Sequence, residues 1–118
     1  KIAFPVLTLE LLGPQQSSKL QACLPIGLQA ASTLAIATEC TYDSAAGAGL
    51  RLHVRASDDG VHCDTVDLYT SDITVQAGGN VRKTIELKPS SKYVKVFVEN
   101  RDSSHAVKAV NVTVTVGN

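Results

Sequence analysis

The sequence contains no Met and no Trp, and aromatic residues make up only 4% of its 118 residues. The core must therefore be built from Val, Leu, Ile and Ala. No apolar run reaches the roughly 20 residues that a membrane-spanning helix requires, because Pro5 and Glu10 interrupt the run Phe4–Leu12. The length favours a single domain, residues 1–118, that is long enough to bury its own core.

Neither sign of charge predominates, because 11 basic residues balance 11 acidic ones. Nucleic-acid binding depends on basic groups that neutralise phosphates, and the sequence has no basic run. We therefore expect no nucleic-acid partner.

Motifs for catalysis and cofactor binding are missing as well. The sequence has no GxxxxGK(S/T), no GxGxxG, no nucleophile elbow and no CxxC. We therefore expect no enzyme, no catalytic residue and no cofactor. A metal site of His62, Cys63 and Asp64 is disfavoured because adjacent strand residues point to opposite faces. We expect these histidines, like His53 and His105, to be exposed or hydrogen-bonded.

Three cysteines, Cys23, Cys40 and Cys63, leave two alternatives open. One intrachain disulfide is compatible with three pairings, and the leftover thiol would be able to crosslink subunits. Three free thiols in the core are the other alternative, because a free cysteine behaves as a small hydrophobic residue.

The most informative pattern in the sequence is a strict alternation of apolar and polar residues. Within Lys92–Gly117, one valine series is Val94, Val96 and Val98, and a second is Val110, Val112, Val114 and Val116. A period of two with β-branched residues on one side indicates two half-buried antiparallel strands.

Alternation predicts further strands at Thr33–Tyr42, Leu50–Ala56 and Val81–Lys88, of which Leu50–Ala56 is clear. Val61–Thr70 is predicted to be a short strand with an irregular exit. A helix competes for Thr33–Tyr42 because that segment is rich in Ala. Leu20–Leu28 contains Pro and Gly and is predicted to be irregular or an edge strand. Turn residues recur at intervals of roughly ten residues. The pattern predicts an all-β fold, an antiparallel β-sandwich of jelly-roll or Ig-like type with about seven or eight strands.

The segment Phe4–Leu12 differs from these strands because it is apolar on both faces. Such a strand is either central in its own domain or covered by another subunit. The second alternative makes residues 1–12 a subunit-contact strand whose edge pairs with a neighbouring chain. Its candidate contact residues are Phe4, Val6, Leu7, Leu9 and Leu11.

Two aromatic residues, Tyr93 and Phe97, are a second candidate interaction site. They share the predicted outer face of one strand with Lys95 and Glu99. Aromatic rings beside charges suit a sugar ring or a protein neighbour. The alternative is that a loop or the rim of the second sheet covers this face, so that it binds no partner.

Acidic residues are densest between positions 58 and 72. Asp58, Asp59, Asp64 and Asp67 are candidate calcium ligands because loop carboxylates suit this ion. The EF-hand spacing is missing, and turn formation explains the same residues without a metal.

Two stretches carry a resemblance to a known family. VRASDDGVHCD (Val54–Asp64) and KYVKVFVEN (Lys92–Asn100) resemble a turn and a later strand of discoidin-like, galactose-binding-type jelly rolls. The layout is also similar to small β-sandwich proteins of phage and virion surfaces or extracellular assemblies. The resemblance implies a jelly roll over about the last two-thirds of the chain. Cys63 stands where the first family usually has an aromatic residue, and the exposed loop aromatics of that family are missing, so sugar or lipid binding does not carry over.

These observations favour a non-enzymatic structural β-sandwich. We expect it to self-assemble as a homo-oligomer or to decorate a larger particle, such as a virion surface, a capsid or an extracellular filament. A chain without Met that begins at Lys1 is expected to be processed or trimmed, and removal of a signal peptide is one explanation. The alternative function is a carbohydrate- or ligand-binding module, with or without calcium, that uses Tyr93, Phe97 and the loop 58–67. A small metalloenzyme is the third.

Overall fold

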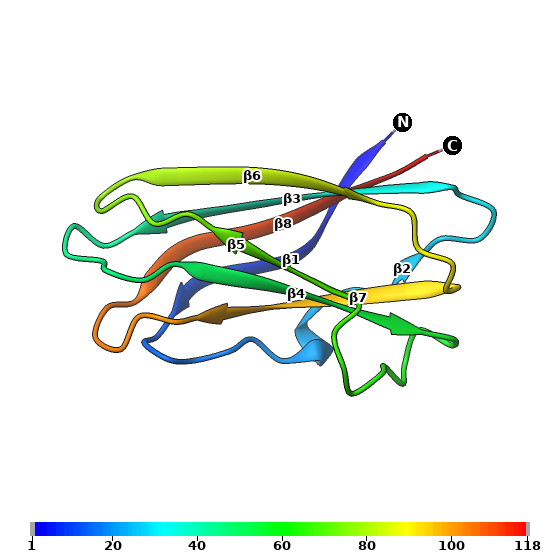
Figure 1. Ribbon diagram of the computed structural model, residues 1–118, viewed down its shortest axis with the longest axis horizontal. Helices are drawn as coiled ribbons and strands as arrows, with labels where there is room; N and C mark the ends of the chain where they lie inside the picture. The colour runs from blue at the N-terminus through cyan, green and yellow to red at the C-terminus, as the bar shows by residue number, and fades with distance from the viewer. Residues whose placement is uncertain (1, 118) are drawn as a thin grey trace.

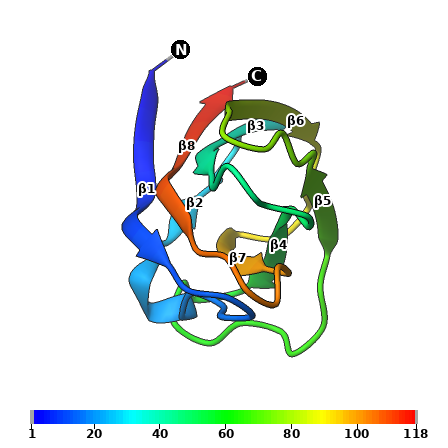
Figure 2. The ribbon, with the colours of Figure 1, turned by 90° about the vertical axis from the view of Figure 1, so that its left-hand side faces the viewer.

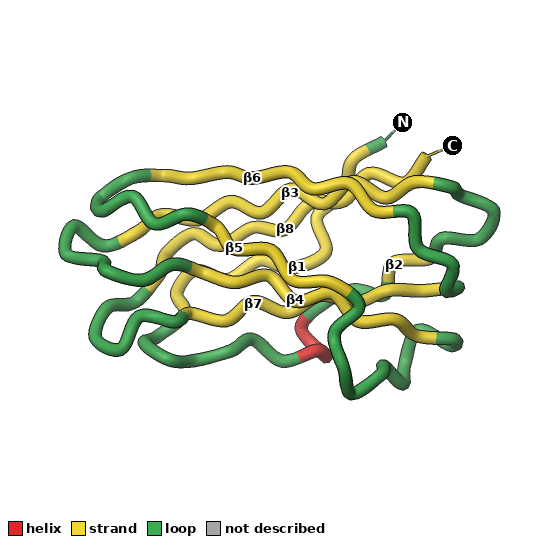
Figure 3. The backbone as a smooth tube through the Cα atoms, in the orientation of Figure 1, coloured by secondary structure: helices red, strands yellow, loops and turns green. Residues whose placement is uncertain are grey.

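The computed structural model describes residues 2–117, and their strands form two packed antiparallel sheets (Figures 1 and 3). The first sheet has the order β1-β8-β3-β6, with strands β1 (Ala3–Leu12), β3 (Thr33–Tyr42), β6 (Asn80–Leu87) and β8 (Val107–Gly117). The second has the order β2-β7-β4-β5, with strands β2 (Ile26–Gly27), β4 (Leu50–Ser57), β5 (Tyr69–Ile73) and β7 (Tyr93–Asn100). Eight strands in these orders form a double-sheet jelly roll, which decides between the two predicted sandwich types.

The core lies between the sheets and follows the alternation in the sequence. In β3 every second side chain is buried, which confirms a strand over the competing helix. Val94, Val96 and Val98 of β7 are fully buried between the sheets. Leu20–Leu28 contains a short 3-10 turn, Leu20–Ala22, and the two-residue edge strand β2, as its Pro and Gly predict.

The strand predicted at Val61–Thr70 is wrong, because a loop connects β4 to a shorter strand that begins at Tyr69. The loop is held by its own polar groups: the Asp59 carboxylate accepts hydrogen bonds from the backbone amides of Val61 and His62, both at 2.8 Å. Gly60 has a φ of 79°, which turns the chain away from the sheet. Local hydrogen bonds of this kind compete with ladder pairing.

Strand β1 is an edge strand, so the central position considered for Phe4–Leu12 is wrong. A bulge between Pro5 and Leu7 shifts its register against β8. As a result Val6 and Leu7 are both buried, while Phe4 and Leu9 pack against the same core. Apolar residues at even-numbered and at odd-numbered positions of β1 therefore face the same core.

The two edges of the sandwich are well separated. Viewed along the strands, β1 lies on one side of the molecule and β5 on the other, with the β4–β5 loop running below the second sheet (Figure 2). Within residues 2–117, no helix is long and apolar enough to cross a membrane.

Candidate functional site

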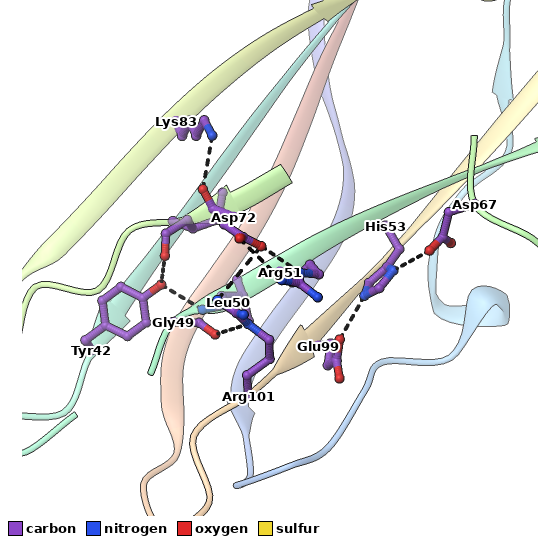
Figure 4. A network of polar contacts seen from close by, with 11 residues as sticks. Tyr42, Gly49, Leu50, Arg51, His53, Asp67, Asp72, Lys83, Glu99 and Arg101 are labelled. Atoms are coloured by element: carbon purple, nitrogen blue, oxygen red, sulfur yellow. Dashed lines mark hydrogen bonds and ion pairs between the residues drawn. The ribbon is translucent and has the colours of Figure 1, made fainter. Parts of the chain in front are cut away.

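The outer face of the second sheet carries a network of charged side chains from β4, β7 and the β4–β5 loop (Figure 4). His53 is central to it, because its Nδ1 lies 2.8 Å from Asp67 Oδ2 and its Nε2 lies 2.9 Å from Glu99 Oε1. Each of its two ring nitrogens thus lies within hydrogen-bond distance of a carboxylate oxygen. The histidine therefore joins β4 to β7 and to the β4–β5 loop.

The aromatic candidates Tyr93 and Phe97 lie within this half-buried face and have partners in the chain. The Phe97 ring stacks on His53 with centroids 4.4 Å apart and planes 2° from parallel, and Arg55 Cζ lies 5.0 Å from its centroid. The Tyr93 ring packs over Gly60, where an added Cβ would meet Tyr93 Cδ1 at 3.2 Å. Neither ring is an open platform.

Two arginines on this face, Arg51 and Arg55, also pair with carboxylates. Arg51 Nε donates to Asp72 Oδ1 at 2.6 Å, and this hydrogen bond lowers the pKa of Asp72. Burial works against the charge of Asp67, but hydrogen bonds from His53 and Arg55 outweigh it and lower the pKa of that carboxyl. The face is thus an interlocked set of ion pairs that fastens the loop to the sheet.

We expect Asp67→Asn to destabilise the fold by about 0.5–1 kcal/mol at pH 7, because it breaks a partly exposed ion-pair network. An unfolded Asp titrates near pH 3.9, and the folded pKa of Asp67 is lower. Its contribution is therefore complete at neutral pH and is lost as the pH falls through the folded pKa. Urea unfolding at pH 7 and at pH 3 measures this.

The control for this variant is Asp58→Asn, which changes an exposed carboxyl in the same loop. We expect it to be neutral at both pH values. An equal cost of Asp67→Asn at pH 7 and pH 3 would show that the network is not electrostatic.

The four candidate calcium ligands do not converge. Asp59 accepts from His62 Nδ1 at 2.7 Å as well as from its loop amides, and Asp67 is engaged by His53 and Arg55. Asp58 and Asp64 are exposed. In residues 2–117, no group of three or more His, Cys, Asp or Glu side chains is arranged to hold a metal ion.

All three cysteines are free thiols in the structure. Burial raises the pKa of Cys23 and of Cys40, which reduces the fraction of each thiol that is present as the reactive thiolate. Cys23 also has a structural role, because its Sγ accepts a hydrogen bond from Val96 N at 3.4 Å and donates one to Leu24 O at 3.2 Å. Cys63 is half-buried, and its backbone forms an isolated antiparallel β-bridge with Ser57.

The free edge of β1, which was the predicted subunit contact, already forms some hydrogen bonds within the chain. Val6 O accepts from Leu24 N at 2.9 Å, and Leu12 O accepts from Asn100 Nδ2 at 3.2 Å. Of the predicted contact residues, Val6 and Leu7 face the core and Phe4 and Leu9 are half-buried. Leu11 is the member of this set with an exposed side chain.

Sequence reasoning missed exposed apolar residues that lie along the β4–β5 loop and at the start of β5. Val61, Val66, Leu68 and Tyr69 are exposed by 72%, 70%, 49% and 44%. Leu68 and Tyr69 border a depression of about 160 Å³ whose other walls are Leu87, Lys88 and Pro89. The apolar residues at 66, 68 and 69 do not keep a strict alternation, and this is the sequence signal that argues against the strand predicted at Val61–Thr70.

Comparison with known proteins places the chain by fold. No protein-family model and no curated protein sequence matches it. The PBSX exported protein XepA is similar in structure, with a TM-score of 0.60 and 15% identity over 98% of this chain and 37% of that one. The C-terminal CBM6 of the laminarinase LamC from Zobellia galactanivorans gives a TM-score of 0.53 with 10% sequence identity, and the match covers 97% of this chain and 99% of that one. Murine APRIL gives a TM-score of 0.53 with 4% sequence identity, and the match covers 98% of each chain.

At such identities the similarity shows the fold alone. It confirms the resemblance drawn from Val54–Asp64 and Lys92–Asn100 to jelly rolls of carbohydrate-binding type and to sandwiches of phage proteins. The chain spans little more than a third of XepA.

Proposed function

We propose that this chain is a non-enzymatic structural β-sandwich that assembles with copies of itself through the segment 61–69. The assembly stands alone or decorates a larger particle, such as a virion surface or an extracellular filament. An extracellular or virion-surface location accords with the exported phage protein among its structural neighbours.

The exposed apolar segment carries this proposal. Leu68 and Tyr69 are adjacent large apolar side chains at the surface, and an exposed apolar patch marks a protein contact more often than isolated apolar residues do. Leu68 and Tyr69 stand beside a shallow depression with an apolar wall from Leu87 and Pro89, which suits insertion of a side chain from a neighbour.

The same segment is already ordered before any contact. Asp59 fixes its beginning and the pairing of Asp67 with His53 and Arg55 fixes its end. Association would therefore lose little conformational entropy in this loop, which favours binding. The charged face beside it is internally paired and offers few free groups for chemistry.

We expect the wild-type protein to form dimers or larger species between about 10 and 100 µM, a range common for modest interfaces. The double variant Leu68→Ser, Tyr69→Ser should associate at least tenfold more weakly, because each contact side chain contributes about 1.5 kcal/mol or more when buried. Sedimentation equilibrium over this concentration range gives both constants.

The matched control is Leu11→Ser, which removes a similarly exposed leucine of β1, the strand on the opposite side of the molecule from β5 (Figure 2). It should leave association unchanged. A wild-type protein that is monomeric throughout the range, or a double variant that associates as well as wild type, would exclude self-assembly through this segment.

Carbohydrate binding is the second candidate, and Tyr69 is the observation that favours it. Tyr69 is exposed and borders a depression, whereas the predicted sugar-binding residues Tyr93 and Phe97 are half-buried and pack within the chain. A glycan array with and without calcium tests this function. Hits that vanish in Tyr69→Ala would support it, and an array without hits in either condition would contradict it.

A further inference from the structure

The depression beside Leu68 and Tyr69 has a positive charge in its wall. Lys88 follows directly after β6 and lines the depression together with the half-buried residues Leu87 and Pro89. Lys88 is exposed, and within residues 2–117 its ammonium group has no ion-pair or hydrogen-bond partner. The depression therefore combines an apolar hollow with an unpaired cation at its rim.

The exposed segment 61–69 carries the opposite charge. Asp64 lies between Val61 and Val66, and its carboxylate has no partner in the described part of the chain. The backbone of Asp64 is nevertheless held in place, because its N donates to Ala56 O at 2.9 Å and its O accepts from Arg55 Nη1 at 3.5 Å. The loop thus presents a free carboxylate from a fixed position.

The size of the depression suits one aliphatic side chain. Its volume is about 160 Å³, close to the roughly 150 Å³ of an apolar cavity that takes one six-membered ring. Val66 is 70% exposed and does not line the depression of its own chain. Val66 and Asp64 are two residues apart, so their Cα atoms lie within about 7 Å of each other. A neighbour that inserts Val66 would therefore bring its Asp64 to the rim where Lys88 stands.

We infer that the protein forms a two-fold dimer in which Val66 of each copy enters the depression of the other and Lys88 pairs with the partner's Asp64. This inference rests on the proposed self-assembly through the segment 61–69 and adds the arrangement of the contact. A two-fold axis makes every contact reciprocal, so the dimer contains two Lys88–Asp64 pairs. Because both copies use the same patch, the assembly closes at two chains.

The two ion pairs determine how the copies are oriented. Exposed pairs contribute little affinity, whereas like charges brought together at a contact are strongly unfavourable and exclude wrong arrangements. The other carboxyl of the segment, Asp67, is already paired with His53 and Arg55. Asp64 is therefore the carboxylate of this segment that is free to select the position of Lys88.

Reversal of each charge tests the arrangement, with association measured by sedimentation in about 150 mM salt, where charges more than about 8 Å apart are largely screened. Lys88→Glu sets two pairs of carboxylates against each other in its homodimer, and Asp64→Lys sets two pairs of ammonium groups. Each variant alone should self-associate at least tenfold more weakly than wild type. An equimolar mixture of the two variants restores one native and one reversed pair, so it should associate as tightly as wild type.

The matched charge controls are Lys108→Glu and Glu10→Lys. They make the same changes of net charge on exposed residues of β8 and β1, at the other edge of the first sheet from β6. Each control, and the mixture of both, should associate as wild type does. The apolar contact has its own pair of variants: Val66→Ser should weaken association at least tenfold, whereas Val61→Ser, at a residue that is 72% exposed, should change it little.

A mixture of Lys88→Glu and Asp64→Lys that associates as weakly as either variant alone would overturn the inference, and so would wild-type species larger than a dimer. Recovery in the mixture cannot come from unfolded protein, so it separates the contact from an effect on folding. If wild type associates and Leu68→Ser, Tyr69→Ser weakens it while the mixture does not recover, self-assembly through the segment stands and the two-fold arrangement is wrong. A wild type that stays monomeric would exclude both.

Discussion

Asn100→Asp is expected to destabilise the protein by about 3–5 kcal/mol, the range for breaking a buried polar network. Asn100 is fully buried at the end of β7. Its Nδ2 donates to three carbonyl oxygens, those of Leu12 at 3.2 Å, Gly13 at 3.1 Å and His105 at 2.9 Å. Its Oδ1 accepts from Asp102 N at 3.0 Å.

The substitution keeps the shape of the side chain and removes its donors. Three carbonyl oxygens would then lose their donor and face a buried carboxylate, which is unfavourable both for the carbonyls and for the charge. One side chain now joins the end of β1, the end of β7 and the β7–β8 loop, so all three would loosen together.

Urea unfolding at pH 7 measures this change, and the pH provides a second reading. Burial raises the pKa of the introduced carboxyl, so its cost should fall when acid protonates it and restores one donor. Asn80→Asp is the matched control, because the Asn80 amide makes an exposed hydrogen bond to Thr41 Oγ1 at 3.0 Å. We expect less than about 1 kcal/mol there. A cost below 1.5 kcal/mol for Asn100→Asp would mean that the network is dispensable.

The strands were predictable where each residue is paired without interruption. The alternation of β3 matches its burial throughout, and that of β7 does so except at Lys95, which is buried on the outer face, because a period of two is a property of every regular strand. β1 defeated the same reasoning, since the bulge at Val6 adds one residue and brings both parities to one face. Nothing in FPVLTLELL alone states where an extra residue is accommodated, because the register depends on β8, more than 100 residues away in sequence.

The sites were harder to predict than the fold for a similar reason. Tyr93 and Phe97 are outward, as expected, but His53 and Gly60 cover them from elements distant in sequence. Asp102 resembles a turn-forming residue in the motif RDSSH, and only the structure brings the amides of Gly47 and Ala48 to it. Sequence patterns report which face a side chain takes, whereas its partners are set by how loops meet at the ends of the sheets.

The junction between the two sheets provides the second large expected effect. Tyr42, a buried residue at the end of β3, reaches across to the second sheet (Figure 4). Its hydroxyl accepts from Leu50 N at 2.9 Å and donates to Ile73 O at 2.5 Å. Burial raises the pKa of Tyr42, so the hydroxyl keeps its proton and remains a donor.

Gly49 passes close to this junction and leaves no room for a side chain. A Cβ at this position would lie 2.5 Å from Ile73 O and 3.2 Å from the Tyr42 hydroxyl. We therefore expect Gly49→Ala to cost about 2–3 kcal/mol, as overpacking against a fixed backbone does. Gly47→Ala is the control in the same loop, because no atom lies within 4 Å of its added Cβ. It should be neutral or slightly stabilising, since alanine restricts the unfolded chain.

A double-mutant cycle shows whether the clash acts through the hydrogen-bonded tyrosine. Tyr42→Phe alone should cost about 2 kcal/mol, because it leaves the Leu50 amide and the Ile73 carbonyl without their partner. Tyr42→Phe removes the hydroxyl that the added methyl group would meet and the hydrogen bond that holds Ile73 O in place. Gly49→Ala should therefore cost less in that background than in wild type. Strictly additive costs would show that the clash with Ile73 O acts independently of Tyr42. A cost for Gly49→Ala as small as that of Gly47→Ala would show that the β3–β4 loop yields freely, which the contacts of Tyr42 and Asp102 on either side of it do not allow.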